Sequence, residues 1–368
     1  MPLTISKLFL PRIVKIAAII IYLTYPPYAY FAASICKDTP FGYATLIFVL
    51  CLLQIGIYGE KFFKSQINIT MFVVSPILMM LHRNNGFHVA ILTAPFLIWY
   101  CKGLLRRRMI IFAVGIVAFN TLWEAFIFDI CGVTRYSDKE KYSLISQQLS
   151  RIAKTEAITQ EDKVNIAKYI TCPVEQFGEV YLPEVSDPTK GLLKMSAIND
   201  DHIGFIGLSL KMIIKYPKSS LEGFLNTTYS YWHIQYIETI GGGGSLNTFP
   251  QRNTLIDKFS QKQLFYNPIT NTAENIMANR NIPIINIVFR NGFVIWVMLF
   301  CFGYCWYRKK YRLMLLYAPL FAIWLICIAS PCNSYRYIYG IVTTLPVLIS
   351  TLFIKCQNSD SLSFTTLH

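Results

Sequence analysis

Charge is scarce in this 368-residue sequence, in which only 15% of the residues are charged, 54% are hydrophobic and the mean hydropathy is +0.41. A soluble domain of this length buries a large core without such an apolar excess. The cysteines show no CxxC pair or regular spacing, so nothing indicates a zinc site or a disulfide framework. The five histidines are scattered (82, 88, 202, 233 and 368) and form no iron-binding cluster, and "GGGG" (241–244) fits no phosphate-binding loop.

The apolar residues are bunched in runs near or below the length of a membrane-spanning helix. The runs cover residues 13–34, 41–58, 67–81, 87–101, 109–128, 286–306, 313–330 and 337–354. No small-residue cleavage site follows the first run, so it is not a cleavable signal peptide. The sequence therefore predicts an all-α integral membrane protein with about eight transmembrane helices.

The net charge of +14 is unevenly distributed along the chain. With a cytoplasmic N-terminus, the short inner segments contain 14 basic residues against two acidic ones, Glu60 and Asp360, whereas residues 129–285 contain 16 of each sign. Basic residues in short loops beside helix ends follow the positive-inside rule. This pattern predicts a multi-pass cell-membrane protein with both termini cytoplasmic, and it excludes nucleic acid as the partner.

This topology divides the chain into four parts. They are an N-terminal membrane region of about five spans (1–128), a mainly helical extracytoplasmic domain between helices 5 and 6 (129–285), a C-terminal membrane region of three spans (286–356) and a short cytoplasmic tail (357–368). In the outer domain, the apolar spacing predicts a helix over 138–157, and "TQED" (159–162) is a candidate helix start. We interpret 177–191 as a loop and 203–217 as an amphipathic helix, at the membrane surface or in the domain core.

Three short outer turns contain polar residues that a plain connection does not need: "CKDTP" (36–40), "HRNNG" (82–86) and "SPCNSYRY" (330–337). The runs flanking "HRNNG" have 15 residues each and reach about 22 Å, less than a ~30 Å hydrocarbon core. The turn is therefore expected to be recessed, where an arginine needs a partner. Lys37, Arg83 and Arg336 are together suited to one phosphate.

Structural explanations of these residues stay open beside the functional one. Arg83 and Arg336 are long enough to reach lipid phosphates, and Lys37 is placed to pair with Asp38. Asn84, Asn85 and Gly86 also match turn chemistry, because Asn and Gly tolerate left-handed backbone. The aromatic residues of 229–233 suit sugar stacking, although membrane anchoring is the commoner role of such residues.

Several stretches together resemble a family of uncharacterised bacterial multi-pass proteins grouped with the GT-C superfamily of polyprenyl-phosphate-sugar-dependent glycosyltransferases. They are "CKDTPFGY", "HRNNGFH", "SLISQQLSRIAKTEAITQEDKVNIAKYI", "VYLPEVSDPTKG", "KYPKSSLEGFLNTTYSYW" and "SPCNSYRYIYGIVTTLPVLI", and they extend over nearly the whole chain. Members of this family usually have further N-terminal helices, and GT-C enzymes place an acidic residue in their first outer loop. The resemblance therefore implies a GT-C-like fold that lacks the usual N-terminal helices.

The resemblance implies transfer of a sugar from a polyprenyl-phosphate donor to an extracytoplasmic acceptor. Asp38 is then the candidate catalytic base, with Asp187, Asp200 and Asp201 as second choices. Lys37, Arg83 and Arg336 are the candidate phosphate ligands, and Asn84, Asn85 and Tyr337 are the candidate contacts to sugar hydroxyls.

The expected partners are a lipid-linked sugar phosphate, a cell-envelope acceptor and membrane lipids. No cofactor is expected, and a requirement for a divalent metal stays open. Three alternatives remain: a truncated and inactive relative of these enzymes, a transporter or flippase for lipid-linked sugars, and a non-catalytic scaffold.

Overall fold

Helices make up nearly all the regular structure of the protein. The computed structural model describes residues 11–33, 36–132, 138–234, 287–329 and 334–354. Within these ranges no β-strand forms, and extended pairing is limited to isolated bridges between Ile170 and Leu193 and between Leu182 and Val185. The predicted all-α class is therefore confirmed for the part of the chain that the structure describes.

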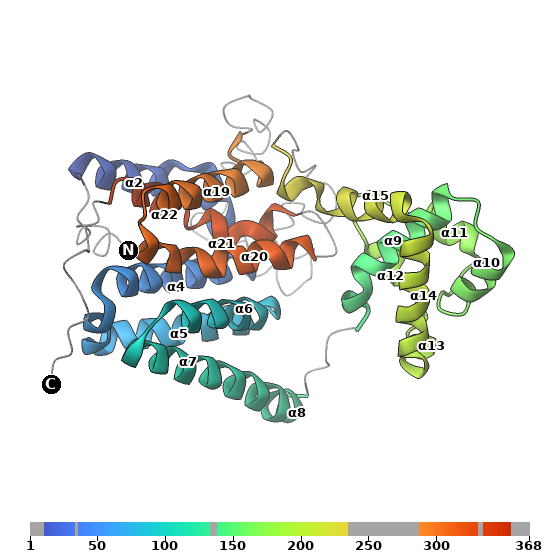
Figure 1. Ribbon diagram of the computed structural model, residues 1–368, viewed down its shortest axis with the longest axis horizontal. Coiled ribbons are helices and arrows are strands. Elements are labelled where there is room, and N and C mark those ends of the chain that lie inside the picture. Colours follow the sequence, from blue (N-terminus) through green and yellow to red (C-terminus); the bar gives the residue numbers. More distant parts are fainter. Residues whose placement is uncertain (1–10, 34–35, 133–137, 235–286, 330–333, 355–368) are drawn as a thin grey trace, which may run out of the picture.

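The apolar runs of the sequence form one bundle of helices (Figure 1). Its N-terminal part consists of α2 (Arg12–Thr24), α3 (Pro26–Ala33), α4 (Asp38–Tyr58), α5 (Gln66–His82), α6 (Asn85–Tyr100), α7 (Gly103–Leu122) and α8 (Phe128–Ile130). Its C-terminal part consists of α19 (Asn291–Tyr307), α20 (Ala318–Ile328), α21 (Tyr339–Val342) and α22 (Leu345–Thr351). Three stretches are long and apolar enough to cross a membrane, namely Asp38–Lys64, Gly103–Ile127 and Tyr311–Ile328.

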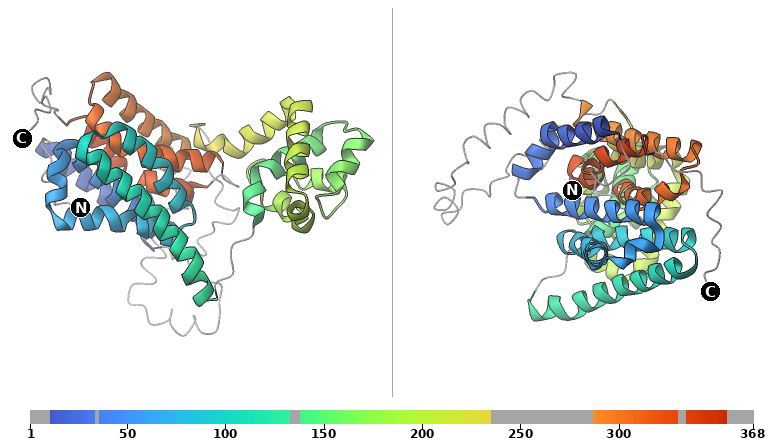
Figure 2. Two further views of the ribbon diagram at one scale, coloured as in Figure 1. Left: turned by 60° about the horizontal axis from the view of Figure 1, so that its bottom comes forward. Right: turned by 90° about the vertical axis from the view of Figure 1, so that its left-hand side faces the viewer.

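The bundle is layered, with α4 near its centre (Figure 2, right). Helix α4 packs against α5 on one side and against α21 and the 3-10 turn Tyr311–Tyr317 on the other. Helices α6 and α7 extend the first side, while α2 lies against α22. Gly42 permits the close crossing of α4 and α21, because a Cβ atom there would lie 2.5 Å from the ring of Tyr339.

Two of the apolar runs are not continuous helices, contrary to the expectation of one span each. The run 13–34 breaks between α2 and α3, where Pro26 and Pro27 remove backbone donors. The run 337–354 breaks between α21 and α22, ahead of Pro346. Carbonyl groups freed by the second break accept hydrogen bonds from the first segment: Tyr28 Oη donates to Val342 O (2.7 Å) and Tyr22 Oη to Thr343 O (2.9 Å). An apolar surrounding requires such partners for every freed carbonyl.

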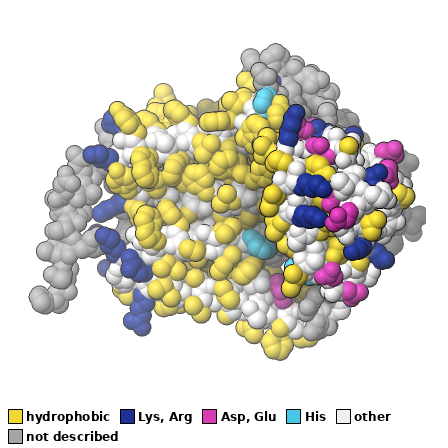
Figure 3. All heavy atoms as spheres, turned by 45° about the vertical axis from the view of Figure 1, so that its right-hand side comes forward, with side chains coloured by type: hydrophobic (Ala, Val, Ile, Leu, Met, Phe, Trp, Pro, Cys, Tyr) yellow, Lys and Arg dark blue, Asp and Glu magenta, His cyan; other side chains and the backbone are white. Residues whose placement is uncertain are grey.

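The outer surface of the bundle is unusually apolar (Figure 3). Helix α7 leaves Ile111 and Val114 62% and 63% exposed, and α2 leaves Leu23 79% exposed. Further large exposed apolar side chains lie on α5, α6 and α19, including Ile67, Leu92, Trp99, Trp296 and Phe300. So many large apolar side chains exposed along neighbouring helices fit a hydrocarbon surrounding and form the apolar belt of the bundle.

The remaining described helices form an outer domain beyond one end of the bundle, joined to it by α15 (Figures 1 and 2). They are α9 (Ser143–Thr155), α10 (Gln160–Ala167), α11 (Val174–Glu179), α12 (Asp187–Gly191), α13 (Met195–Asp200), α14 (His202–Lys215) and α15 (Pro217–Thr228). Thr159 caps α10 by accepting from the Asp162 N–H, so the predicted helix start is confirmed. Pro217 opens α15, where its missing N–H has no helical partner to lose.

Two predictions for the outer domain need correction or refinement. The stretch 177–191 is not one long loop, because α11 extends into it and α12 lies within it. Helix α14 does pack into the domain core, through Phe205 and Met212. Its opposite face leaves Ile203 and Ile214 85% and 76% exposed, so the helix is apolar on both faces.

Basic side chains gather at the end of the bundle farthest from the outer domain (Figure 3). Lys61 and Lys64 lie in the 3-10 turn Gly59–Lys64, which follows α4. Arg106, Arg107 and Arg108 lie near the start of α7, and Arg108 pairs with Glu60 at 2.8 Å. The charge asymmetry that the sequence predicts between the two ends of the bundle therefore has a counterpart in the fold.

Candidate functional site

The turn "HRNNG" lies at the end of the bundle that faces the outer domain. Helix α5 ends at His82, Arg83 follows in extended backbone, and α6 begins at Asn85. The Arg83 N–H donates to Met79 O (3.1 Å), and the Gly86 N–H donates to Arg83 O (2.8 Å). Gly86 is required here, because a Cβ atom would lie 2.2 Å from Met79 O. This tight turn directs the Arg83 side chain inward, and only 9% of that side chain is exposed.

The partner of Arg83 is Asp38, the first residue of α4. Arg83 Nη1 lies 2.5 Å from Asp38 Oδ1, and the Asp38 side chain is 2% exposed. The Cys36 thiol donates to the other carboxylate oxygen, Oδ2, at 3.1 Å. The N-terminus of α4 adds an electrostatic attraction to the Asp38 side chain. Burial, and after it the neighbouring Asp38 charge, raises the pKa of the Cys36 thiol.

The alternative pairing of Asp38 with Lys37 does not form. Lys37 precedes α4 with its side chain exposed, and it has no ion pair with any described residue. The two side chains leave a helix start in different directions, so adjacency in sequence does not bring their charges together. The carboxylate instead joins the first outer turn to the second.

Tyr337 brings the third outer turn to the same place. The guanidinium carbon of Arg83 lies 4.6 Å from the centre of the Tyr337 ring, and that of Arg336 lies 5.1 Å from it. Arg336 Nη2 also donates to Tyr337 Oη at 3.5 Å, and its charge acts on Cys36. Cations over an aromatic face gain electrostatic stabilisation from the ring. The three turns therefore meet, as the sequence predicts.

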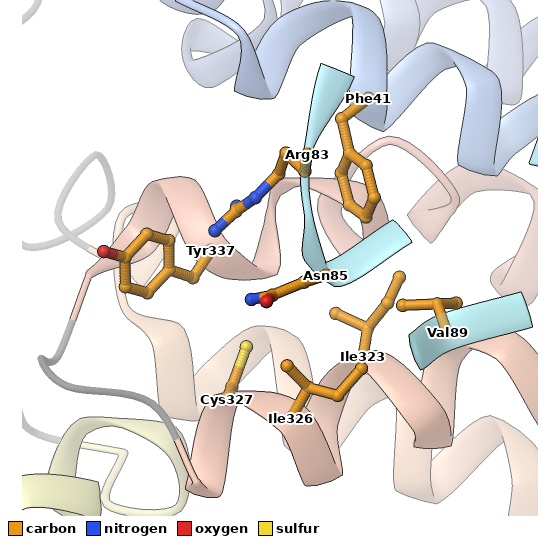
Figure 4. A pocket seen from close by; sticks show the side chains of 8 residues that line it. All are labelled: Phe41, Arg83, Asn85, Val89, Ile323, Ile326, Cys327 and Tyr337. Carbon is orange, nitrogen blue, oxygen red and sulfur yellow. The ribbon is translucent and has the colours of Figure 1, made fainter. Parts of the chain in front are cut away.

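A small pocket opens beside this cluster (Figure 4). Its polar lining comes from Arg83, Asn85 and Tyr337, and its apolar lining comes from Phe41, Val89, Ile323, Ile326 and Cys327. Asp38 is not among the lining residues. The cavity volume is about 10 Å³, near the least that holds one water molecule. In this conformation the pocket admits no sugar phosphate without movement of its walls.

Other sequence-predicted residues lie outside the pocket. Asn84 is exposed at the start of α6, and its side chain does not cap the helix. In the outer domain, Asp187 pairs with Lys190 (2.5 Å), Asp200 is exposed, and Asp201 caps α14. A hydrogen bond from Tyr169, and after it the Gly204 N–H, lowers the pKa of Asp201.

The aromatic group at 229–233 connects the outer domain with the bundle. The Trp296 indole on α19 donates to Trp232 O at 2.9 Å, and the rings of Tyr229 and His233 stack with their centres 4.3 Å apart. None of these residues lines the pocket. The "GGGG" run lies outside the described residues.

Sequence reasoning did not identify the apolar wall of the pocket. Ile323, Ile326 and Cys327 lie on one side of α20, and Phe41 lies in the first turn of α4. Their spacing is that of ordinary packed helices, so no signal in the sequence separates them from core residues. Among the described residues, no group of three or more His, Cys, Asp or Glu side chains could hold a metal ion.

The fold and the cluster define a class of helical protein. It has helices long and apolar enough to cross a membrane, an outer domain, and a buried charged cluster at the end of the bundle that faces this domain. Within this class, the profile of a family described as "Family of unknown function (DUF6020)" matches residues 3–362. The chain belongs to this family. Comparisons with curated proteins and with solved structures find no match.

Proposed function

We propose that the protein is a multi-pass membrane glycosyltransferase of the GT-C type. It transfers a sugar from a polyprenyl-phosphate donor to an acceptor on the extracytoplasmic side. The observation that carries the proposal is the junction of the three outer turns, where the buried pair Asp38–Arg83 and the Arg336–Tyr337 contact meet beside a half-apolar pocket. A lipid-linked phosphate needs both properties, cations for its headgroup and apolar walls for its chain.

In the proposed topology, all eight apolar runs cross the cell membrane, with residues 129–285 outside and both termini in the cytoplasm. The alternation of helix directions supports it: α4 starts and α5 ends at the end of the bundle near the outer domain, where α6 starts again. The basic residues at the opposite end support the same orientation. The donor would then reach the pocket from the outer leaflet.

The residues have distinct roles in the proposed reaction. Arg83 and Arg336 hold the donor phosphate, and Lys37 adds positive charge at the rim. Asn85 and Tyr337 contact sugar hydroxyl groups from inside the pocket, and Asn84 does so from outside it. The acceptor oxygen bonds to the anomeric carbon as the bond from that carbon to the phosphate oxygen breaks. The electron pair leaves with polyprenyl phosphate, and the acceptor proton passes to the Asp38 carboxylate.

One observation favours a second candidate, a transporter or flippase for lipid-linked sugars. Discontinuous helices are typical of transporters, and the segment formed by α21 and α22 is broken at Thr343 and Thr344. In transporters, however, such breaks expose backbone groups to the substrate. Here Tyr22 and Tyr28 already bind the freed carbonyls, so the break stabilises packing instead.

The test uses the full chain reconstituted in vesicles with radiolabelled polyprenyl-phosphate hexoses. We expect the wild type to consume at least one donor and release polyprenyl phosphate. Asp38→Asn should lower the rate about 10²- to 10⁴-fold, the usual contribution of a general base. Asp138→Asn is the matched control and should retain activity, because Asp138 lies in the outer domain and has no proposed role in the reaction. Movement of intact donor between leaflets without consumption would contradict the transferase and favour the flippase.

A further inference from the structure

The Arg83 side chain contacts the Asp38 carboxylate and also lines the pocket. Arg83 lines the pocket and contacts Tyr337, another lining residue, whereas Asp38 does not line it. The carboxylate is only 2% exposed, and both of its oxygens have partners, Arg83 and Cys36. In this state Asp38 cannot take a proton from a molecule in the pocket.

Arg83 has hydrogen-bond donors that the contact with Asp38 does not use. A guanidinium group carries five N–H donors, and among the described residues its side chain has one hydrogen-bond acceptor, Asp38 Oδ1. The contact uses Nη1 alone and is not a two-point fork. A phosphate in the pocket offers several oxygens at fork geometry and thus a better match to the guanidinium.

We propose that the Asp38–Arg83 pair is a latch that a phosphate group opens. The phosphate draws the guanidinium away from the carboxylate, and this movement of the pocket wall opens a path between the pocket and Asp38. Arg83 is thus a positioning residue that makes the base available only when an anionic headgroup is bound. The inference rests on the proposed function for the role of Asp38 as the base, but the exchange of partners itself is a binding property.

The latch makes a prediction that a purely structural ion pair does not. Asp38 and the phosphate compete for one cation, and two neighbouring anions repel each other. Asp38→Asn removes this competition while its amide oxygen still accepts a hydrogen bond from Arg83. Binding of a phosphate should therefore become tighter. An ion pair that only holds α4 to α5 would, when weakened, leave the affinity unchanged or lower it.

The experiment titrates the full-length protein in detergent with farnesyl phosphate and measures the dissociation constant by calorimetry. Asp38→Asn should bind about 10-fold tighter than wild type, which corresponds to about 1.4 kcal/mol. Asp138→Asn is the control and should bind like wild type, because its carboxylate is 55% exposed and lies in the outer domain. Unchanged or weaker binding by Asp38→Asn would overturn the latch.

A second variant, Arg83→Lys, tests the proposal even if Asp38→Asn does not fold. Arg83→Lys retains the charge but not the planar fork, so it should bind farnesyl phosphate more weakly. In the Arg83→Lys background the gain from Asp38→Asn should shrink, because the competing group is altered. A full 10-fold gain in that background would show that the effect does not pass through Arg83 and would overturn the proposal.

Two further ligands identify the group that opens the latch. Farnesol has the same chain without the anion, and a gain with farnesol would contradict the exchange. If Asp38→Asn binds both inorganic phosphate and farnesyl phosphate more tightly than wild type, the phosphate group alone opens the latch. If only farnesyl phosphate binds more tightly, the latch opens for a lipid-linked phosphate.

The outcome is separable from that of the proposed function, because this equilibrium involves no sugar. If Asp38→Asn binds phosphate more tightly but the protein consumes no donor, the latch is supported and the transferase is contradicted. If the protein consumes a donor but Asp38→Asn binds phosphate no more tightly than wild type, the transferase is supported and the latch is contradicted. Failure of both wild type and Asp38→Asn to bind farnesyl phosphate would overturn both.

Discussion

At the scale of single residues, two carboxylates decide much of the protein's electrostatics. Asp38 and Asp162 each have a side chain that is only 1–2% exposed, and each meets a cation. A buried charge without a partner is strongly unfavourable, so these contacts are conditions for folding rather than additions to it. Asp38 differs from Asp162 because its cation, Arg83, also borders a pocket.

Arg83→Ala should destabilise the protein by leaving Asp38 buried and uncompensated. We expect a loss of about 3–5 kcal/mol, the usual effect of removing one partner of a buried pair. Adding Asp38→Asn should recover more than half of this loss, since it removes the stranded charge. Denaturant unfolding in detergent measures the free energy of unfolding of the single and the double variant. Equal stability of the single and double variants would show that the pair is not the cause.

At the scale of elements, α10 and α14 are held together by ion pairs, of which the one between Asp162 and Lys215 is the shortest. Asp162 lies in the first turn of α10 and accepts from Lys215, in the last turn of α14. Both charges have the sign that their helix ends favour. Thr159, the cap of α10, also donates to Asp162 at 2.8 Å. The hydrogen bond from Lys215, opposed by burial and aided by Thr159, lowers the pKa of Asp162.

This pKa shift predicts a pH dependence of stability. The folded-state pKa of Asp162 lies below its unfolded value, so its contribution is fully present above the unfolded pKa. The contribution is lost as the pH falls through the folded pKa. Asp162→Asn should therefore lower the stability at neutral pH by about 1 kcal/mol, because Lys215 is partly exposed. The difference from wild type should disappear in acid.

Thermal unfolding of the full chain at several pH values measures this difference. Asp200→Asn is the control, because Asp200 is exposed in the same domain and forms no ion pair with a described residue. A difference between Asp162→Asn and wild type that persists unchanged into acid would contradict the assignment.

At the scale of the whole molecule, the apolar belt and the outer domain give the protein two unlike ends. One end carries clustered basic residues (Figure 3), and the other carries the buried Asp38–Arg83 pair and the outer domain (Figure 1). The belt between them has a surface suited to lipid. The proposed orientation in the membrane follows from this asymmetry.

Cysteine labelling tests that orientation. A cysteine at position 160, in the first turn of α10, should react with an impermeant thiol reagent on intact cells. A cysteine at position 309, just after α19, should react only after permeabilisation. Serine replaces the native Cys131 and Cys172 of the outer domain in both variants to lower the background, and the same chain without an added cysteine measures what remains. Labelling of position 309 in intact cells would contradict the proposed topology.

The sequence by itself determined the features that depend on local patterns. Apolar runs placed the bundle helices, because each run must avoid water along its whole length. The Thr159 cap and the start of α15 at Pro217 follow from single backbone donors, which neighbouring residues decide. The position of the three outer turns at one end of the bundle also followed, because alternating helix directions return every second turn to the same end.

Only the tertiary structure decided which groups touch within that meeting point. Asp38 pairs with Arg83 and not with its neighbour Lys37, because the close turn at Gly86 directs Arg83 toward the start of α4. The apolar wall from α20 and the breaks in the first and last segments depend in the same way on contacts between distant parts of the chain. Such contacts depend on the shape and direction of packed side chains, which the spacing of residue types along one chain does not record.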